Sequence, residues 1–154
     1  MKKKLWQNKR PERGQSLVEL AISLTFIILL LSGAITFGMA YFSFLSLNDA
    51  AQEGALYGSL KPNDLAGIIN RVQATSTSPV DLSQIPDSQI VVTYNNGKDC
   101  QGSVPLVNGV TNTITVTVTY TYKIFMPFIS AAIGGNTIPL RGTATDSILT
   151  PACH

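Results

Sequence analysis

The sequence predicts an α+β protein, in which a long N-terminal transmembrane helix precedes a small antiparallel β-sheet domain packed on helix. Two patterns support this prediction. Residues 20–47 contain no Asp, Glu, Lys, Arg or His, whereas residues 113–124 alternate apolar and polar side chains without a break. The first pattern is typical of a membrane span and the second of a strand with one face on a core. A composition of 45% hydrophobic and 13% charged residues argues against a disordered chain and against a nucleic-acid binder.

The first 14 residues, 1–14, form a basic leader. They contain six of the eleven Lys and Arg residues and one carboxylate, Glu12, so the remaining chain is mildly acidic. Because Lys and Arg that flank a span are retained on the cytoplasmic side, we expect the N-terminus in the cytoplasm. The C-terminal domain, residues 61–154, is then expected on the extracytoplasmic side of the cytoplasmic (inner) membrane.

The apolar segment is long enough to cross that membrane. Residues 20–47 would form about 42 Å of helix, against a hydrocarbon core of about 30 Å. Aromatic side chains at residues 41–44 favour the interface, so the membrane part is expected over about residues 20–44. Good helix formers continue beyond it as far as Gly58, which predicts one helix over residues 15–60.

Two alternatives also explain a basic head followed by an apolar segment. A cleaved secretory signal peptide has an apolar region of only about 7 to 15 residues, which is shorter than this one. A plain uncleaved signal anchor fits the length and stays open on these features alone.

Beyond the long helix, the sequence predicts a second, short helix and a sheet. Apolar side chains recur at helical spacing over residues 63–73, where Asn63 is a candidate cap, and a Ser-, Thr- and Pro-rich loop follows over residues 74–89. The expected strands and one intervening helical turn are, in chain order, residues 90–94, 113–124, 128–133 (the turn) and 137–149.

The strand over residues 113–124 has the clearest alternation. Its Thr-rich face is expected to meet water, and the opposite face a core covered by helix 63–73 and by the outer half of the long helix. The apolar face consists of Ile114, Val116, Val118, Tyr120, Tyr122 and Ile124. The expected result is an antiparallel sheet of three or four strands.

A short motif lies immediately before the span. Gly14 ends the basic leader, and Glu19 stands five residues after it. This junction resembles the processing site of type IV pilin precursors, in which a peptidase cleaves after the Gly and a Glu follows at the fifth position of the mature chain. The resemblance implies cleavage between Gly14 and Gln15.

A wider resemblance is to the TadE-like family, pilin-like proteins of the tight-adherence (Flp) pilus system. It rests on the stretch GQSLVELAISLTFIILLL, with a Val-Glu pair at the membrane entrance, and on an A-x-x-G-A run at residues 51–55. Many members continue that run with Arg, where this chain has Leu56, so any contact made by that Arg is in doubt. The long strand, the Met-Pro-Phe-Ile segment after it and the closing strand also look like those of TadE-like chains.

The resemblance implies a pilin-like fold and a structural role. The partners that it implies are a prepilin-type peptidase, other pilin-like subunits and membrane assembly proteins. The implied location is the inner membrane, with the protein also in an extracellular pilus after assembly.

Glu19 is a candidate for assembly. We expect it in the first helical turn, where the helix dipole favours a carboxylate. After cleavage, the α-amino group of Gln15 would lie one turn away, and a carboxylate near hydrocarbon needs a cation, either this amine or that of a neighbouring subunit. The alternative is that Glu19 only marks the water boundary.

Ala34 and Gly38 are candidates for helix packing. They form a small-xxx-small pair, which lets a second helix approach closely, although such pairs also arise by chance in apolar segments.

Cys100 and Cys153 are the two cysteines, and we expect them to form a disulfide outside the membrane. In the chain-entropy model this bond would stabilise the domain by about 4 kcal/mol. Two free thiols in an envelope that is not oxidising are the alternative.

The chain has no motif of catalysis, cofactor binding or metal binding. The single histidine, His154, adjoins Cys153 and gives at most two metal donors, and P-loop, GxGxxG and HExxH motifs are missing from the sequence. Basic residues beyond the leader are scattered, and the carboxylates Asp81, Asp87 and Asp99 read as turn formers. We therefore expect no enzyme, no cofactor, no small-molecule substrate and no nucleic-acid partner.

The leading hypothesis is a TadE-like minor pilin or pseudopilin, cleaved after Gly14 and inserted by its N-terminal helix into a pilus or secretion assembly. The rival hypothesis is an uncleaved single-span protein whose outer β domain is a binding module. A mature N-terminus at Gln15 would separate the two.

Overall fold

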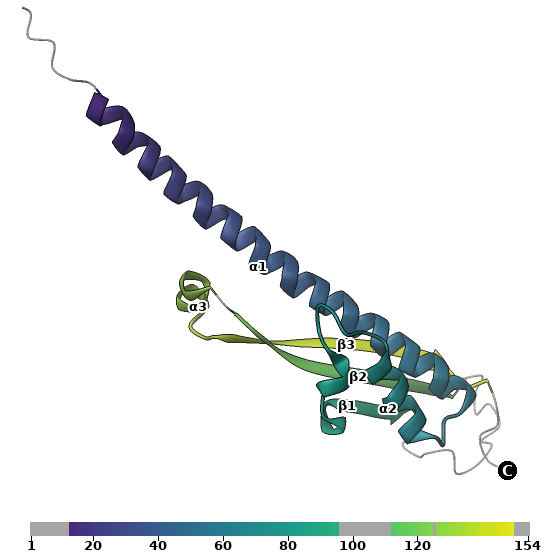
Figure 1. Cartoon of the computed structure of the whole chain (residues 1–154). Coiled ribbons are helices and arrows are strands. Elements are labelled where there is room, and N and C mark those ends of the chain that lie inside the picture. Colours follow the sequence, from purple (N-terminus) through teal and green to yellow (C-terminus); the bar gives the residue numbers. More distant parts are fainter. Residues whose placement is uncertain (1–12, 96–111, 125, 150–154) are drawn as a thin grey trace, which may run out of the picture. The chain divides into compact units, whose positions relative to one another are not determined.

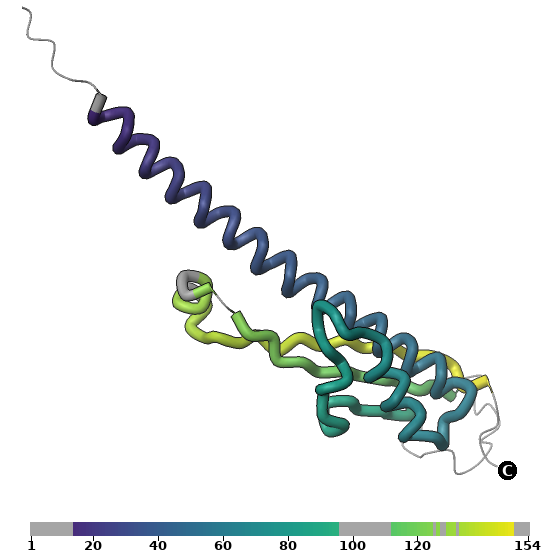
Figure 2. The backbone as a smooth tube through the Cα atoms, in the orientation of Figure 1, coloured from purple at the N-terminus to yellow at the C-terminus, as the bar shows by residue number. Residues whose placement is uncertain are grey.

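The computed structural model of the protein describes residues 13–95, 112–124 and 126–149. The chain divides into two compact units, with the boundary after Ile35, inside the first helix. The order of elements confirms the α+β prediction, and Figure 2 traces the same backbone. The elements labelled in Figure 1, with two short 3-10 turns η1 and η2, are α1 (Arg13–Leu60), α2 (Leu65–Ala74), η1 (Leu82–Gln84), η2 (Asp87–Gln89), β1 (Ile90–Tyr94), β2 (Thr113–Lys123), α3 (Pro127–Ile133) and β3 (Thr137–Ser147).

The first helix, α1, is continuous over 48 residues. It ends at Leu60, as the sequence predicts, and a last helical bond runs from the backbone N–H of Lys61 to the carbonyl of Tyr57 at 3.0 Å. Pro62 follows, and proline cannot continue the hydrogen-bond ladder of a helix. The helix begins at Arg13, two residues before the predicted start at Gln15.

In the second unit, β1, β2 and β3 form an antiparallel sheet with β2 in the centre (Figure 1). In the register of β2, Val116 lies opposite Val92 of β1, and Val118 lies opposite Gly142 of β3. The strands follow one another in chain order, so the sheet is a simple meander. Three strands among the described residues agree with the expected three or four.

The outer edge of β3 is covered by α1. The side-chain oxygen Oδ1 of Asn48 accepts a hydrogen bond from the backbone N–H of Thr143 at 3.3 Å, and the N–H of Leu149, just after the strand, donates to the carbonyl of Ser59 at 3.0 Å. Gly142 packs so closely on the α1 backbone that a side chain there would overlap it. An uncovered edge strand can pair with other chains, so this contact protects the sheet.

One hydrophobic core lies between the sheet and the two helices. It confirms the predicted apolar face of β2 and the prediction that α2 and the outer half of α1 cover it. Its members from these three elements are Leu47, Ala50, Ala51 and Ala55 of α1, Ile68 and Val72 of α2, and Ile114, Val116 and Val118 of β2.

The A-x-x-G-A run at residues 51–55 lies at the closest approach of α1 to the core. A Cβ added to Gly54 would stand 2.5 Å from Cγ2 of Val72 and 3.3 Å from Cγ1 of Val116. One turn later, a Cβ at Gly58 would overlap the side chain of Ile114. Small residues are therefore required here because α2 and β2 both reach the helix backbone.

Two details of the loop regions differ from the expectations. The cap of α2 is Asp64, whose side chain accepts the backbone N–H of Gly67 at 2.9 Å, so the prediction that Asn63 caps this helix was wrong. The reason is that the helix begins at Leu65, which places Asp64 in the capping position. The loop over residues 74–89 also contributes to the core, because Val80, Leu82 of η1 and Ile85 are buried.

The polar face of β2 is less exposed to solvent at its centre than predicted. Thr117 is only 6% exposed, because Val91 of β1 and Thr143 of β3 flank it in the register and its hydroxyl lies 3.3 Å from that of Thr143. Its neighbour Thr119 is half-buried, and Thr121 is exposed. A central strand is therefore shielded by its neighbours even on the face that has no helix cover.

Replacement of Val118 by Asp should unfold the sheet. The substitution places an unpaired carboxylate in the core at a cost of several kcal/mol, comparable to the whole stability of a small domain. Amide hydrogen exchange of β2 in the detergent-solubilised full chain measures this loss. The matched control is Thr119→Asp, opposite Arg141, which should keep the protection of β2 nearly intact. Equal loss of protection in both variants would contradict the one-sided core.

Candidate functional site

The first unit presents an apolar surface that the described chain does not cover. Twelve large apolar side chains between Leu17 and Ile35 are all more than half exposed. Six of them are consecutive, at residues 26–31, so they point to every side of the helix. A helix that is apolar all round belongs in the core of a large protein or in a membrane. Among the described residues, α1 is the one helix that is long and apolar enough to cross a bilayer.

Two of the hydroxyl groups in this stretch are already bonded within the helix. Thr25 Oγ1 donates to the carbonyl of Ala21 at 2.8 Å, and Ser32 Oγ donates to the carbonyl of Ile28 at 2.9 Å. In lipid, a polar group without such a partner would cost several kcal/mol. The hydroxyl groups of Thr25 and Ser32 can therefore enter hydrocarbon with their hydrogen bonds already made.

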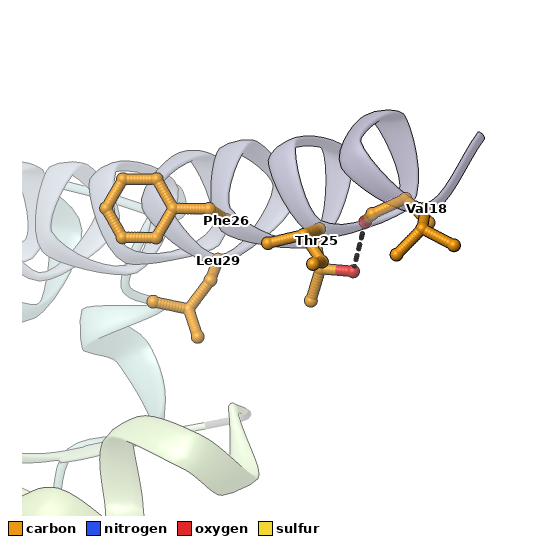
Figure 3. A pocket seen from close by; sticks show the side chains of 6 residues that line it. Val18, Thr25, Phe26 and Leu29 are labelled. Atoms are coloured by element: carbon orange, nitrogen blue, oxygen red, sulfur yellow. Dashed lines mark hydrogen bonds between the residues drawn. The ribbon is translucent and has the colours of Figure 1, made fainter. Parts of the chain in front are cut away.

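A shallow, open groove runs along one face of this stretch (Figure 3). All of its lining comes from α1 itself, at helical spacing, and the hydroxyl of Thr25 is turned to the helix backbone. A ligand pocket needs a concave wall with a few polar groups directed at the ligand, and this groove has neither. It offers only apolar contact, to lipid or to another helix. The lining residues are Val18, Ala21, Ile22, Thr25, Phe26 and Leu29.

The predicted processing residues lie at the start of α1 and are exposed. Gly14 and Gln15 belong to its first turn, and a Cβ added to Gly14 would meet nothing within 4 Å. Because the helix already begins at Arg13, Gly14 is helical rather than extended and Glu19 lies in the second turn. The expectation that Glu19 stands in the first turn was therefore wrong for the full chain.

The predicted packing pair also leaves space for a partner. Ala34 is exposed, and a Cβ added to Gly38 would meet nothing within 4 Å. Whether a second helix uses this face stays a prediction. The two cysteines, Cys100 and Cys153, and the leader before Arg13 lie outside the residues that the structure describes.

A polar cluster that sequence reasoning missed joins the end of α1 to α2. Tyr57 donates its hydroxyl to Oδ2 of Asp64 at 2.7 Å, while Arg71 pairs with Glu53 at 3.3 Å. The Arg71 guanidinium carbon and the Lys61 ammonium nitrogen lie 5.5 and 5.7 Å from the centroid of the Tyr57 ring. The partners come from two helices and the turn between them, so no single sequence period brings them together.

The cluster shifts two pKa values, those of Asp64 and Tyr57. The hydrogen bond from Tyr57, helped by the backbone N–H of Gly67, lowers the pKa of the Asp64 carboxyl below its usual value. The same bond, to a carboxylate, raises the pKa of Tyr57, and the positive charge of Arg71 opposes that rise. A carboxyl with a lowered pKa stabilises the fold above its usual pKa, and this contribution is lost as the pH falls through the lowered value.

The cluster has the features of a structural joint. Its members are bonded to one another and to backbone at the protein surface, and the described chain contains no group of three His, Cys, Asp or Glu side chains that could hold a metal ion. Sequence reasoning could have found Asp64 from its place before a helical pattern, but not its bond to Tyr57.

Comparison with known proteins identifies the N-terminal segment. The family model described as TadE-like protein matches residues 14–56, which include the Gly14 junction, the apolar stretch and the A-x-x-G-A run. No curated protein and no solved structure matches the chain. The match covers less than half of the chain, and it confirms the TadE-like resemblance for this N-terminal segment.

Replacement of Asp64 by Asn should lower the pKa of Tyr57. The substitution removes the negative charge that accepts the phenol proton, while Arg71 still favours the phenolate. Phenolate absorbance during a pH titration measures the shift, and the difference from a Tyr57→Phe chain isolates this tyrosine from the other four. Asp81→Asn, which removes a carboxylate bonded to Ser83 and Gln84, is the control and should leave Tyr57 unchanged. A Tyr57 titration that is identical with and without Asp64 would rule out the bond.

Proposed function

We propose that this protein is a minor pilin-like subunit of a tight-adherence (Flp-type) pilus or secretion assembly, made as a precursor and cleaved after Gly14 by a prepilin-type peptidase. The observation that supports this most is the uncovered apolar helix from Leu17 to Ile35, which begins directly after an exposed Gly14 within the TadE-like match. α1 then holds the protein in the cytoplasmic membrane, with its N-terminus in the cytoplasm and the sheet on the extracytoplasmic side.

Cleavage requires an accessible, unwound backbone at Gly14. Helix ends open with free energies near zero, and a glycine makes a helix weaker by about 1 kcal/mol than an alanine. Gly14 is the second residue of α1, and an added Cβ would meet none of the described residues within 4 Å. Unwinding of the first turn at the membrane surface therefore costs little, and the basic leader keeps this turn on the cytoplasmic side.

Cleavage would give Glu19 a new partner. The α-amino group created on Gln15 stands four residues before Glu19, and residues four apart are neighbours on a helix surface. A paired carboxylate tolerates an apolar environment far better than an isolated one. The amine of the same subunit, or that of a neighbour, would let Glu19 move into a helical assembly.

Assembly would exchange lipid for protein around the apolar stretch. Dispersion contacts and small residues, rather than loss of water, drive helix association in a bilayer. The groove over residues 18–29 and the Ala34–Gly38 face would receive helices of other pilin-like subunits. Membrane assembly proteins would act at the same surface.

Replacement of Gly14 by Trp should leave the complete precursor in the membrane. A bulky side chain at the cleaved bond blocks the peptidase, while the apolar stretch still inserts. N-terminal sequencing of the membrane-fraction protein should find Gln15 first in the wild type and the leader intact in the variant. Gly33→Trp, which also meets open space in α1, should be cleaved normally. A Gly14 variant still shortened to Gln15 would count decisively against this site.

Replacement of Glu19 by Ala should separate insertion from assembly. The span becomes more apolar, so membrane insertion is retained, but the proposed pair with the mature amine is lost. Crosslinking in membranes should recover fewer subunit partners than in the wild type. Glu19→Asp keeps the negative charge and should restore part of the yield of crosslinked subunit partners. If Glu19→Ala crosslinks to the same partners in the same amounts, Glu19 has no part in assembly.

A further inference from the structure

The β2–β3 hairpin ends in an apolar tip, defined as residues 126–135. It contains α3 and has no ionisable side chain. Ile133 in this tip is 56% exposed, and Gly134, in the left-handed conformation with φ of 76°, turns the chain back toward β3. Two exposed cations stand behind the tip: Lys123 at the end of β2, and Arg141 of β3, which lies opposite Thr119 and so four register positions further from the tip.

The direction of β2 leads this tip toward the membrane side of the second unit. Ile114 packs at Gly58 of α1 and Val116 packs at Gly54, while Gly142, the partner of Val118, packs at Leu47. As β2 proceeds, its contacts therefore step back along α1 toward the N-terminus. Figure 1 shows α3 at the end of the hairpin to which β2 runs.

The tip reaches the level at which α1 leaves the bilayer. From Val118 to Lys123, the end of β2, the strand covers about 17 Å at the rise of a strand, or about 12 Å along the helix axis if the strand is inclined by about 45°. The predicted exit at residues 41–44 is only about 5 to 9 Å from Leu47 along the helix axis. A strand in this direction brings its apolar end to the membrane surface or into it.

We propose that the hairpin tip is a second membrane contact, in which α3 enters the interface with its exposed side chain Ile133 and Lys123 and Arg141 meet lipid phosphates. An apolar insertion flanked by cations is the chemistry of interfacial membrane binding. The inference rests on the membrane location of α1 within the proposed function, but not on cleavage. It would hold the sheet at the bilayer by two points instead of one.

The test uses tryptophan fluorescence of the full chain in phosphatidylcholine and phosphatidylglycerol vesicles. In a Trp6→Phe background, Ile133→Trp reports on the tip and Thr93→Trp, at an exposed position of β1, is the matched control. We expect blue-shifted Ile133→Trp emission that is quenched by lipids brominated near the headgroup and protected from iodide. Thr93→Trp emission should not be blue-shifted, should not be quenched by the brominated lipids and should be quenched by iodide. Iodide quenching of both to the same extent would overturn the proposal.

One further variant, read together with Ile133→Trp, distinguishes the outcomes. Phe26→Trp, in the apolar stretch of α1, should be quenched by lipids brominated deep in the acyl chain. If it is not, α1 does not span the bilayer, and the proposed function fails together with this inference. If Phe26→Trp is quenched while Ile133→Trp is protected from iodide but not quenched by brominated lipid, protein covers the tip. That result overturns the membrane contact alone.

Discussion

The apolar side chains of α1 between Leu17 and Ile35 have no cover from the described chain, and the remaining structure follows from this constraint. A surface of that kind is unstable in water, so the helix needs lipid or other helices. Yet the same continuous helix supplies Leu47, Ala51 and Ala55 to the core of a water-facing domain. One part of α1 therefore needs apolar surroundings, while another part of the same helix packs into the core of a domain that faces water. Its sequence changes accordingly, from large apolar residues on all sides to small residues on one face.

The small residues determine how the outer domain attaches to the helix. Gly54 and Gly58 leave no space for a Cβ beside α2 and β2, and Gly142 leaves none beside the α1 backbone. These contacts are close because they join backbone to backbone or to a core side chain, so packing alone explains the A-x-x-G-A run. Where many TadE-like chains carry Arg after this run, Leu56 is half exposed and outside the core. The departure from the family pattern thus leaves the attachment of the domain intact.

The parts of the fold that depend on local periodicity could be predicted from the sequence. The uncharged stretch predicted the long apolar helix, and the alternation at residues 113–124 predicted the buried face of β2. Features that depend on contacts across the chain could not be predicted. Val80, Leu82 and Ile85 are buried in a loop without periodicity, Tyr57 finds Asp64 across a helix end, and the wet face of β2 is shielded by its neighbours. Glu19 was placed one turn too early because a helix start needs no cap signal when the first turn is exposed. The predicted disulfide lies outside the described residues.

The charges around Glu19 bear on the proposed cleavage. In the full chain, Glu19 has no cation within one helical turn, because Gln15, Ser16, Ile22 and Ser23 occupy the neighbouring positions and Arg13 lies six residues away on another side of the helix. Its carboxylate therefore belongs at the water boundary before processing. Cleavage after Gly14 would remove Arg13 and place an amine at residue 15, one of the positions from which a cation reaches Glu19 on the same face. Under the proposed mechanism, the peptidase thus does more than shorten the chain, since it would supply the counter-charge that lets this carboxylate leave water and enter a helical assembly.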